Sequence, residues 1–382
     1  MIKSGNYSVF LQEPMTYHNK TIDEKSEAMS FEEYRINEKK GLEFGLYTLG
    51  DHLENPREGK RISAQQRLNE LIDMARLAEQ AGLDVISVGE SHQDYFTTQA
   101  HTVVLSAIAQ ATEKIKLSSS STIISTLDPV RVFEDFATID LISNGRAEIV
   151  AGRASRVGLF ELLGYELRDY EELFEEKFEL LLQINKEERV TWQGEFRPPL
   201  KDAHILPRPL NGKLPIWRAV GGAPASAMKA GYQGVPMTLA MLAGPASLFK
   251  RSIDAYRETL DASGYNSEEF PVATAGFFYA AETTQQAQRD YYPHINEGMK
   301  RTNGQGFPKQ QFAQGAHQKN IMNVGSPQEI IEKILYQHET FGHQRYMAQL
   351  DFGGVPFDKI MKNIELIGNE ILPAVKKYTA KQ

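Results

Sequence analysis

The chain contains no cysteine among its 382 residues. This excludes disulfide bonds, thiolate nucleophiles and sulfur-bound metals, and it fits a reducing compartment. Long apolar runs are also missing, because no stretch approaches the roughly 18 consecutive apolar residues of a membrane span. The N-terminus "MIKSGNYSVFLQEP" lacks the apolar centre of a signal peptide. We therefore expect a cytoplasmic protein that does not associate with membranes.

Basic residues are fewer than acidic residues in this chain. The chain has 42 Lys and Arg residues against 50 Asp and Glu residues, which gives a formal net charge of −8. A sequence-independent nucleic-acid binder needs a basic face, so we expect no nucleic-acid partner. A hydrophobic fraction of 41% and a charged fraction of 24% are typical of globular proteins.

Eight short, β-rich apolar segments recur from residue 42 onward. They are residues 42–49, 85–89, 115–124, 147–151, 215–220, 235–240, 272–281 and 345–352. Helical segments separate them, with N-terminal capping signals at Ser63, at Asp128-Pro129 and at Ser326. Strands that alternate with helices form parallel βαβ units, and eight such units predict an α/β fold, a (β/α)8 TIM barrel. An open doubly wound sheet is the alternative, but no G-x-G-x-x-G follows the first strand.

Three regions fall outside this repeat. Residues 1–40 are polar and predict an N-terminal extension, with a short helix near 31–38, so residues 41–382 form the single barrel domain. Residues 153–214 hold one helix followed by an irregular stretch. We expect the longest insertion between strand 7 and the last helices, where a polar, Gly-rich segment at 285–320 predicts a lid.

The stretch "SNGRAEIVAGRAS", residues 143–155, raises the question of a bound anion. A predicted core strand ends there, and Arg153 follows directly among small residues. The small neighbours leave their backbone N–H groups accessible. An anion such as phosphate could therefore bind to these N–H groups and to the Arg153 guanidinium together. A solvated arginine on a surface loop is the simpler alternative.

The segment "STLDPVRVFEDFATIDLISNGRAEIVAGRAS", residues 125–155, resembles the bacterial luciferase-like flavin-dependent monooxygenase family. Further similar segments follow the family's order: "AGLDVISVGESH", "LLGYELRDYEE", "LPIWRAVGGAPAS" and "QLDFGGVPFDKIMKNIELIGNEILPAV". The resemblance extends over residues 42–377, which is the length of a full barrel.

The resemblance implies a barrel that binds a flavin, with reduced FMN supplied by a separate reductase or by NAD(P)H. A deazaflavin is the less favoured cofactor. The implied reaction is the oxidation of a small organic substrate by O2. A homodimer, or a dimer with a related chain, would form through the helices that flank strands two to four.

The resemblance also implies that the anion at Arg153 is the flavin phosphate. The phosphate would be bound together with the start of the helix that follows the fifth strand. The residues implied for this phosphate site are Arg153, Ala154, Ser155, Gly221, Gly222 and Ala225.

The third strand contains the unusual run "SSSST", residues 118–122. In the family, a cis peptide that does not involve proline makes room for the flavin ring at the end of this strand. Ser120 and Ser121 occupy that position, which implies that they contact the cofactor. The alternative is an ordinary trans strand whose serines bond to neighbouring strands.

The second strand ends in "GESHQDYF", where family members often have Glu-His-His. The first histidine assists chemistry at the flavin in luciferases, and Ser91 replaces it here, so we do not expect a light-emitting reaction. Glu90 and His92 remain: His92 as a proton donor, a substrate contact or a structural residue, and Glu90 as a buried acceptor. These three residues are the predicted catalytic group. A second departure lies near Glu171, where luciferases have another phosphate-binding arginine that Arg168 could replace.

Three other functions stay open on the sequence alone. They are a deazaflavin-dependent reductase, a non-catalytic flavin-binding relative, and a barrel hydrolase or isomerase in which Arg153 binds a sugar phosphate. No metal site is predicted, because His338 and His343 are five residues apart on a helix and face different directions.

Overall fold

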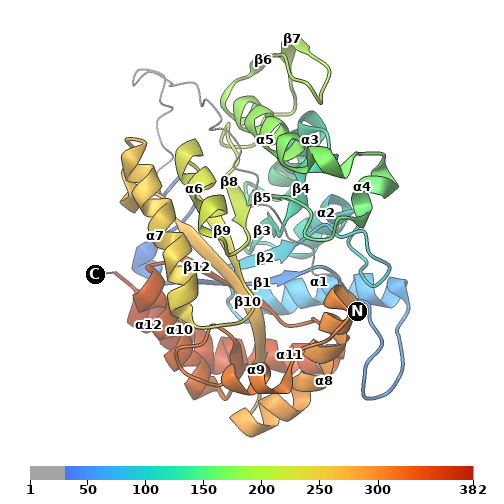
Figure 1. Cartoon of the computed structure of the whole chain (residues 1–382), viewed down its shortest axis with the longest axis vertical. Helices are drawn as coiled ribbons and strands as arrows, with labels where there is room; N and C mark the ends of the chain where they lie inside the picture. Colours follow the sequence, from blue (N-terminus) through green and yellow to red (C-terminus); the bar gives the residue numbers. More distant parts are fainter. Residues whose placement is uncertain (1–30, 382) are drawn as a thin grey trace, which may run out of the picture.

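Eight parallel strands close into a barrel in the computed structural model, which describes residues 31–381 (Figure 1). The strand order is β1-β2-β3-β5-β8-β9-β10-β12, and β12 pairs with β1 to close the ring. β4 continues beyond β3 and pairs with β5. The barrel strands are β1 Glu43–Thr48, β2 Val85–Val88, β3 Lys116–Ser119, β4 Thr122–Ile123, β5 Ala147–Gly152, β8 Ile216–Val220, β9 Met237–Met241, β10 Val272–Ala280 and β12 Arg345–Gln349.

The predicted TIM barrel is therefore confirmed, with each of the eight predicted segments forming a barrel strand and the third divided into β3 and β4. The predicted helix starts are confirmed as well. The Ser63 side chain accepts a hydrogen bond from the Gln66 amide at 3.1 Å, and the Asp128 side chain accepts one from the Val130 amide at 2.8 Å. Caps of this kind satisfy amides that have no partner within the helix.

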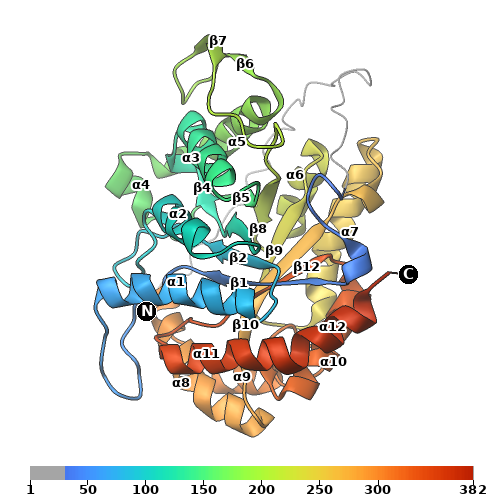
Figure 2. The same cartoon turned by 180° about the vertical axis from the view of Figure 1, so that it is seen from behind.

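Helices surround the barrel on all sides in the two opposite views (Figures 1 and 2). They are α1 Ala64–Gln80, α2 His101–Ala111, α3 Pro129–Ile142, α4 Gly158–Leu163, α5 Tyr170–Lys186, α6 Pro224–Gln233, α7 Ala246–Ala262, α8 Thr284–Asn303, α9 Lys309–Gln314, α10 Pro327–Phe341, α11 Phe357–Leu366 and α12 Leu372–Thr379. Within residues 31–381, no helix combines the length and the apolarity that crossing a membrane requires.

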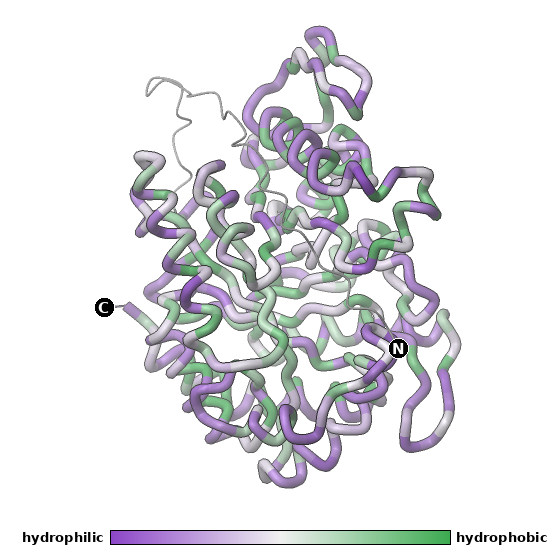
Figure 3. Tube along the Cα trace, viewed as in Figure 1, coloured by the Kyte–Doolittle hydropathy of each residue, from purple (hydrophilic) through white to green (hydrophobic). Residues whose placement is uncertain are grey.

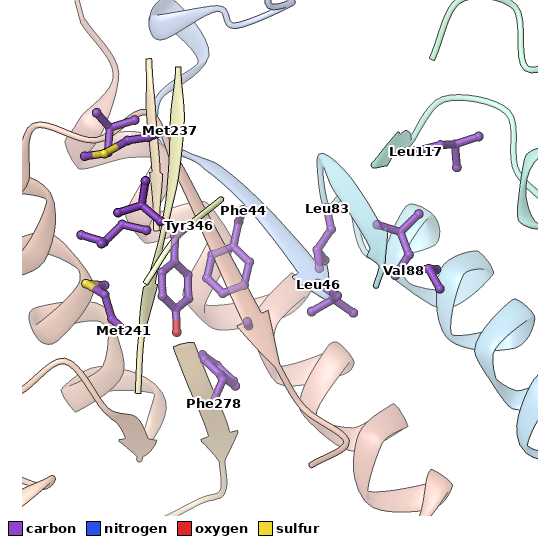
Figure 4. Close-up of a cluster of buried hydrophobic side chains, with 14 of the residues drawn as sticks. Phe44, Leu46, Leu83, Val88, Leu117, Met237, Met241, Phe278 and Tyr346 are labelled. Carbon is purple, nitrogen blue, oxygen red and sulfur yellow. The ribbon is translucent and has the colours of Figure 1, made fainter. Parts of the chain in front are cut away.

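The main apolar core lies between the strands and these helices. Phe44 of β1 packs edge-on against Tyr346 of β12 and Phe278 of β10, with ring centroids 5.2 and 6.0 Å apart (Figure 4). Hydrophilic and hydrophobic positions alternate along the surrounding helices (Figure 3), as expected when each helix turns one apolar side toward the strands. This layer fixes the strands, and with them the positions of the strand ends.

The amino-terminal end of the barrel interior is closed by buried charges. The Arg345 guanidinium donates to Glu43 at 2.8 Å and to Glu148 at 2.6 Å, and it lies 4.8 Å above the Trp217 ring. Burial alone would lower the pKa of Arg345, but the two carboxylates outweigh it and raise the pKa above its usual value. Burial likewise raises the pKa of Glu148, and Arg345 outweighs that effect, so the net direction is downward. Arg345 and Glu148 are therefore both charged, and each is paired within the barrel.

The described part of the predicted extension, residues 31–40, packs under this end of the barrel. Tyr34 and Ile36 are buried, and the Tyr34 ring meets Trp217 edge-on at 5.7 Å. The predicted helix at 31–38 is wrong: residues 31–35 form turns, and a 3-10 helix covers Glu38–Lys40. Arg35 has a φ of 57°, outside the helical region, and its side chain donates to the Ala147 carbonyl at 2.9 Å. A tertiary contact therefore overrides the local helical preference.

The region between β5 and β8 contains a hairpin where an irregular stretch was predicted. β6 Arg189–Trp192 and β7 Leu200–His204 pair in an antiparallel manner at one end of the molecule (Figure 1). The loop between them is held by Glu176 of α5, whose carboxylate accepts from the amides of Glu195 and Phe196 at 2.7 and 3.1 Å. The missed signal is the β-rich triplet Val190-Thr191-Trp192, followed by a Gln-Gly turn.

The predicted lid segment, residues 285–320, is built mainly from α8 and α9. Thr283 caps α8 by accepting from the Gln286 amide at 3.2 Å, and Tyr291 and Phe307 are buried. A short strand, β11 Asn323–Gly325, then pairs with β10 before α10 begins. The segment therefore adds an ordered layer over the end of β10, and its action as a lid stays a prediction.

Glu148→Gln tests the buried charges at the closed end. The substitution removes one of the two carboxylates that compensate Arg345, so we expect the free energy of unfolding to fall by about 3 kcal/mol. Chemical denaturation at neutral pH measures it, and Glu113→Gln at an exposed position is the matched control. A loss no larger than that of the control would show that Glu148 is not needed to compensate Arg345.

Candidate active site at the carboxyl ends of the strands

The ends of β2, β4 and β5 meet around Ser120 and Ser121. The peptide bond between these two serines is cis, as the resemblance implies. A Cβ added to Gly89 would lie 2.0 Å from the Ser120 carbonyl oxygen, and one added to Gly152 would lie 2.2 Å from the Ser121 hydroxyl. Glycine is therefore required on both sides, because any side chain would push the strand ends apart.

Glu90 ties the end of β2 to β4. One of its carboxylate oxygens accepts from the Ile123 amide at 2.8 Å, and the other accepts from Nε2 of His92 at 2.8 Å. The Glu90 amide also donates to the Ser121 carbonyl at 2.9 Å. Glu90 is thus the buried acceptor that the sequence predicts, and it fixes the orientation of the His92 ring.

His92 is partly accessible, with 13% of its side chain exposed. Because Glu90 takes the hydrogen on Nε2, Nδ1 is the ring nitrogen free to exchange a proton with a ligand. Ser91, at the position of the family's first histidine, is buried and donates to the Gln93 side chain at 3.0 Å. His92 is therefore the more accessible of these two side chains.

His101, the first residue of α2, joins this group. Its Nε2 lies 2.8 Å from the Thr122 hydroxyl, and its Nδ1 lies 3.9 Å from Glu90. Burial lowers the pKa of His101 more strongly than the Glu90 carboxylate raises it, which favours the neutral ring. No local sequence signal places its partner, Thr122 of β4, beside it.

Arg153 lies just beyond β5 and reaches the start of α6. Nη2 donates to the Ser226 hydroxyl at 3.2 Å, and Nη1 pairs with Glu171 of α5. The guanidinium carbon also lies 5.7 and 5.8 Å from the ring centroids of Tyr170 and Phe174. Arg153 is therefore held between α5 and α6, and 20% of its side chain is exposed.

Lys229 is a second cation at this place. Its Nζ donates to Glu171 at 3.0 Å and lies 3.3 Å from Glu175, which also accepts from Arg218 at 2.7 Å. Burial lowers the pKa of Lys229, but the two carboxylates outweigh it and raise the pKa. We call Arg153, Ser226 and Lys229 the oxyanion cradle, because all three donors converge beside the amino-terminal end of α6.

The other residues predicted for the phosphate site follow β5 or lie between β8 and the first turn of α6. Gly221 and Ala225 are exposed, and a Cβ added to Gly221 would meet no atom within 4 Å. Gly222 has a φ of +69°, and Ala223 precedes α6 as its N-cap. Ser155 is exposed. These residues follow two strands that pair with each other, β5 and β8. Their contact with a phosphate stays a prediction.

Ala154 is buried, and its carbonyl accepts from the Tyr170 hydroxyl at 2.7 Å. Arg168, the suggested replacement for a second phosphate-binding arginine, has 81% of its side chain exposed and lies 3.7 Å from Asp169. The second cation of the oxyanion cradle is instead Lys229. The signal for it was the Ser-x-x-Lys spacing in the first turns of α6, which places both side chains on one face.

A buried pair of carboxylates lies at the ends of β1 and β12. Asp51 accepts from the amides of Gly353 and Gly354, both at 2.9 Å, while Asp351 accepts from Arg67 at 2.5 Å. Burial raises the pKa of Asp51 to about 6, and the Asp351 charge adds to the rise. This pair joins the first and last strands at the mouth of the barrel.

Comparisons with known proteins find relatives of similar sequence and similar fold. A family model described as Luciferase-like monooxygenase matches residues 42–344. The structure of monooxygenase RslO1 from Streptomyces bottropensis is 23% identical, with a TM-score of 0.77 and coverage of 87% of this chain and 99% of that chain. The oxygenating constituent of 3,6-diketocamphane monooxygenase from Pseudomonas putida, in complex with FMN, is 18% identical, with a TM-score of 0.69 and coverage of 87% and 98%. At these identities the structural matches support the fold.

One curated relative is described as dependent on F420, whereas the Pseudomonas putida structure contains FMN. The F420-dependent glucose-6-phosphate dehydrogenase from Kineococcus radiotolerans is 31% identical over 215 residues, which covers 54% of this chain and 63% of that protein. F420 is a deazaflavin, so similar proteins include users of both cofactor types.

Asp51 predicts a specific pH dependence of stability. Because its pKa is higher in the folded protein, the folded state binds the proton more tightly, and the resulting stabilisation is lost as the pH rises through about 6. A rise from 3.8 to about 6 corresponds to about 3 kcal/mol. The free energy of unfolding of the wild type, minus that of Asp51→Asn, should therefore fall between pH 4 and pH 7. A pH-independent difference would mean that Asp51 is ionised throughout this range.

Proposed function

The chain belongs to the luciferase-like monooxygenase family, and from this premise we propose that it is a flavin-dependent monooxygenase that uses reduced FMN and O2 to oxidise a small organic substrate. Family membership already makes it an oxidoreductase with a flavin-type cofactor. The proposal adds FMN as the cofactor and O2 as the oxidant. A separate reductase or NAD(P)H would supply the reduced FMN.

The oxyanion cradle is the observation that carries the proposal. The Glu171 carboxylate bridges Arg153 and Lys229, so an oxyanion of this chain already occupies the place where a phosphate would bind. The open space at Gly221 and the start of α6 allow a larger anion to approach the same donors. The residues present therefore fit a flavin phosphate, with Arg153, Lys229 and Ser226 as the groups that would hold it.

The remaining site residues would position the ring and handle protons. Bound reduced flavin supplies the electrons that activate O2. The Ser120–Ser121 segment would support the ring, because it lies beside the phosphate site along the same row of strand ends. His92, oriented by Glu90, would exchange a proton through Nδ1 at the reacting atoms.

Two other functions of the same fold are distinguishable. The F420-dependent relative makes a deazaflavin-dependent reductase the second candidate, and such an enzyme would transfer hydride without consuming O2. The third candidate is a flavin-binding protein without catalytic activity, because Ser91 replaces the histidine that assists the chemistry in luciferases. Anaerobic reduction followed by mixing with O2 separates the three, because only the proposed enzyme consumes O2 in a substrate-dependent manner.

A dimer remains part of the proposal. Val103 of α2 is 67% exposed, and Leu141 and Ile142 at the end of α3 are 42% and 44% exposed. These apolar side chains lie on helices that flank the second to fourth barrel strands, where the resemblance implies that a second copy or a related chain would bind.

Arg153→Ala tests the phosphate assignment. We expect FMN to bind about 100-fold more weakly, because a charge-assisted hydrogen bond to phosphate is lost. Riboflavin, which has no phosphate, should bind the variant and the wild type equally well. Fluorescence quenching of both flavins gives the dissociation constants, and Arg168→Ala at an exposed arginine is the matched control. An unchanged dissociation constant for FMN refutes the assignment.

His92→Ala separates catalysis from binding. Substrate-dependent O2 uptake should fall by about 100-fold, while the dissociation constant for FMN changes by less than about threefold, as expected for a lost general acid or base. His204→Ala, at an exposed histidine of β7, is the matched control. Equal O2 uptake by the variant and the wild type would return His92 to a structural role.

A further inference from the structure

Glu171 occupies the oxyanion cradle as part of the protein itself. One of its carboxylate oxygens pairs with Nη1 of Arg153, and the other accepts from Nζ of Lys229 at 3.0 Å. Both cations that would hold a phosphate are therefore already engaged with one anion. A phosphate and this carboxylate cannot share the two cations without bringing like charges into contact.

Glu171 is also the member of this cluster that is free to leave. It lies in the first turn of α5 with 45% of its side chain exposed, against 20% for Arg153. Water can therefore solvate the released carboxylate. Arg153 would keep its bond to Ser226, and Lys229 would keep Glu175 at 3.3 Å, so the donors stay in place when Glu171 moves away.

We propose that Glu171 is an internal competitor of the flavin phosphate, which must displace it in order to bind. This inference rests on the proposed function and adds a specificity-determining residue to it. The competition reduces the affinity for FMN and leaves the affinity for riboflavin unchanged. The chain therefore discriminates less strongly between phosphorylated and unphosphorylated flavins than the donors alone would allow.

The size of the effect follows from the strength of the internal pair. When only a fraction of the molecules has a free site, the apparent dissociation constant rises by the inverse of that fraction. A partly exposed ion pair changes an equilibrium constant by about fivefold. Removal of the Glu171 charge should therefore tighten FMN binding by about the same factor.

Glu171→Gln tests the inference, with FMN and riboflavin titrated separately and followed by fluorescence quenching. We expect the dissociation constant for FMN to fall by about fivefold and that for riboflavin to stay unchanged. Glu172→Gln is the matched control, because it removes the same charge from the next, exposed residue of the same helical turn. In the Arg153→Ala background, the gain from Glu171→Gln should shrink, since the competitor and the ligand share that arginine.

Each other outcome is decisive. If Glu171→Gln binds FMN as the wild type does, or more weakly, while Arg153→Ala still loses FMN, then Glu171 positions Arg153 and the competition is wrong, although the proposed function stands. If FMN and riboflavin affinities rise together, the effect does not act through the phosphate and the inference is also wrong. If neither flavin binds the wild type, the proposed function fails, and the inference fails with it.

Discussion

The contact between Arg153 and Ser226 is the interaction on which the functional site depends. It joins the residue that follows β5 to the first turn of α6, and it exists because β5 and β8 are neighbours in the closed barrel. The pairing of these two strands brings residues more than 70 positions apart in the sequence into one group of donors. The same neighbour relation brings Lys229 beside Arg153 and places both next to the positive end of a helix.

A second group along the same row of strand ends has a comparable origin. Glu90 binds the Ile123 amide and His92 at once, so one buried carboxylate both fixes the path of β4 and orients the accessible histidine. Two of the ion-pair groups described above differ in their exposure to solvent. At the amino-terminal end, Arg345 is fully buried and fully paired, which suits stability. At the carboxyl end, the ion pairs of Arg153 and Glu171 are partly exposed, which allows exchange with a ligand.

Much of the fold was predictable, because its signals are local. Strands buried on both faces are short apolar runs, and helix starts such as Ser63 depend on residues three positions apart. Features that depend on tertiary contacts were missed or wrong. Arg35 leaves the helical region to reach Ala147, and Glu176 organises a hairpin loop that the sequence presents as irregular. In the candidate site, the positions of Arg153 and His92 just beyond strand ends were predictable, while their roles stay predictions. The partners Glu171, Lys229 and His101 were not predictable, since the packing of α5, α6 and α2 brings them there.

A crystal structure of the chain bound to FMN tests the central claim most directly. The account predicts that the phosphate lies within hydrogen-bonding distance of the Arg153 guanidinium and the Ser226 hydroxyl, with the Glu171 side chain turned toward solvent. FMN bound elsewhere, with the Arg153–Glu171 pair intact, would contradict the account.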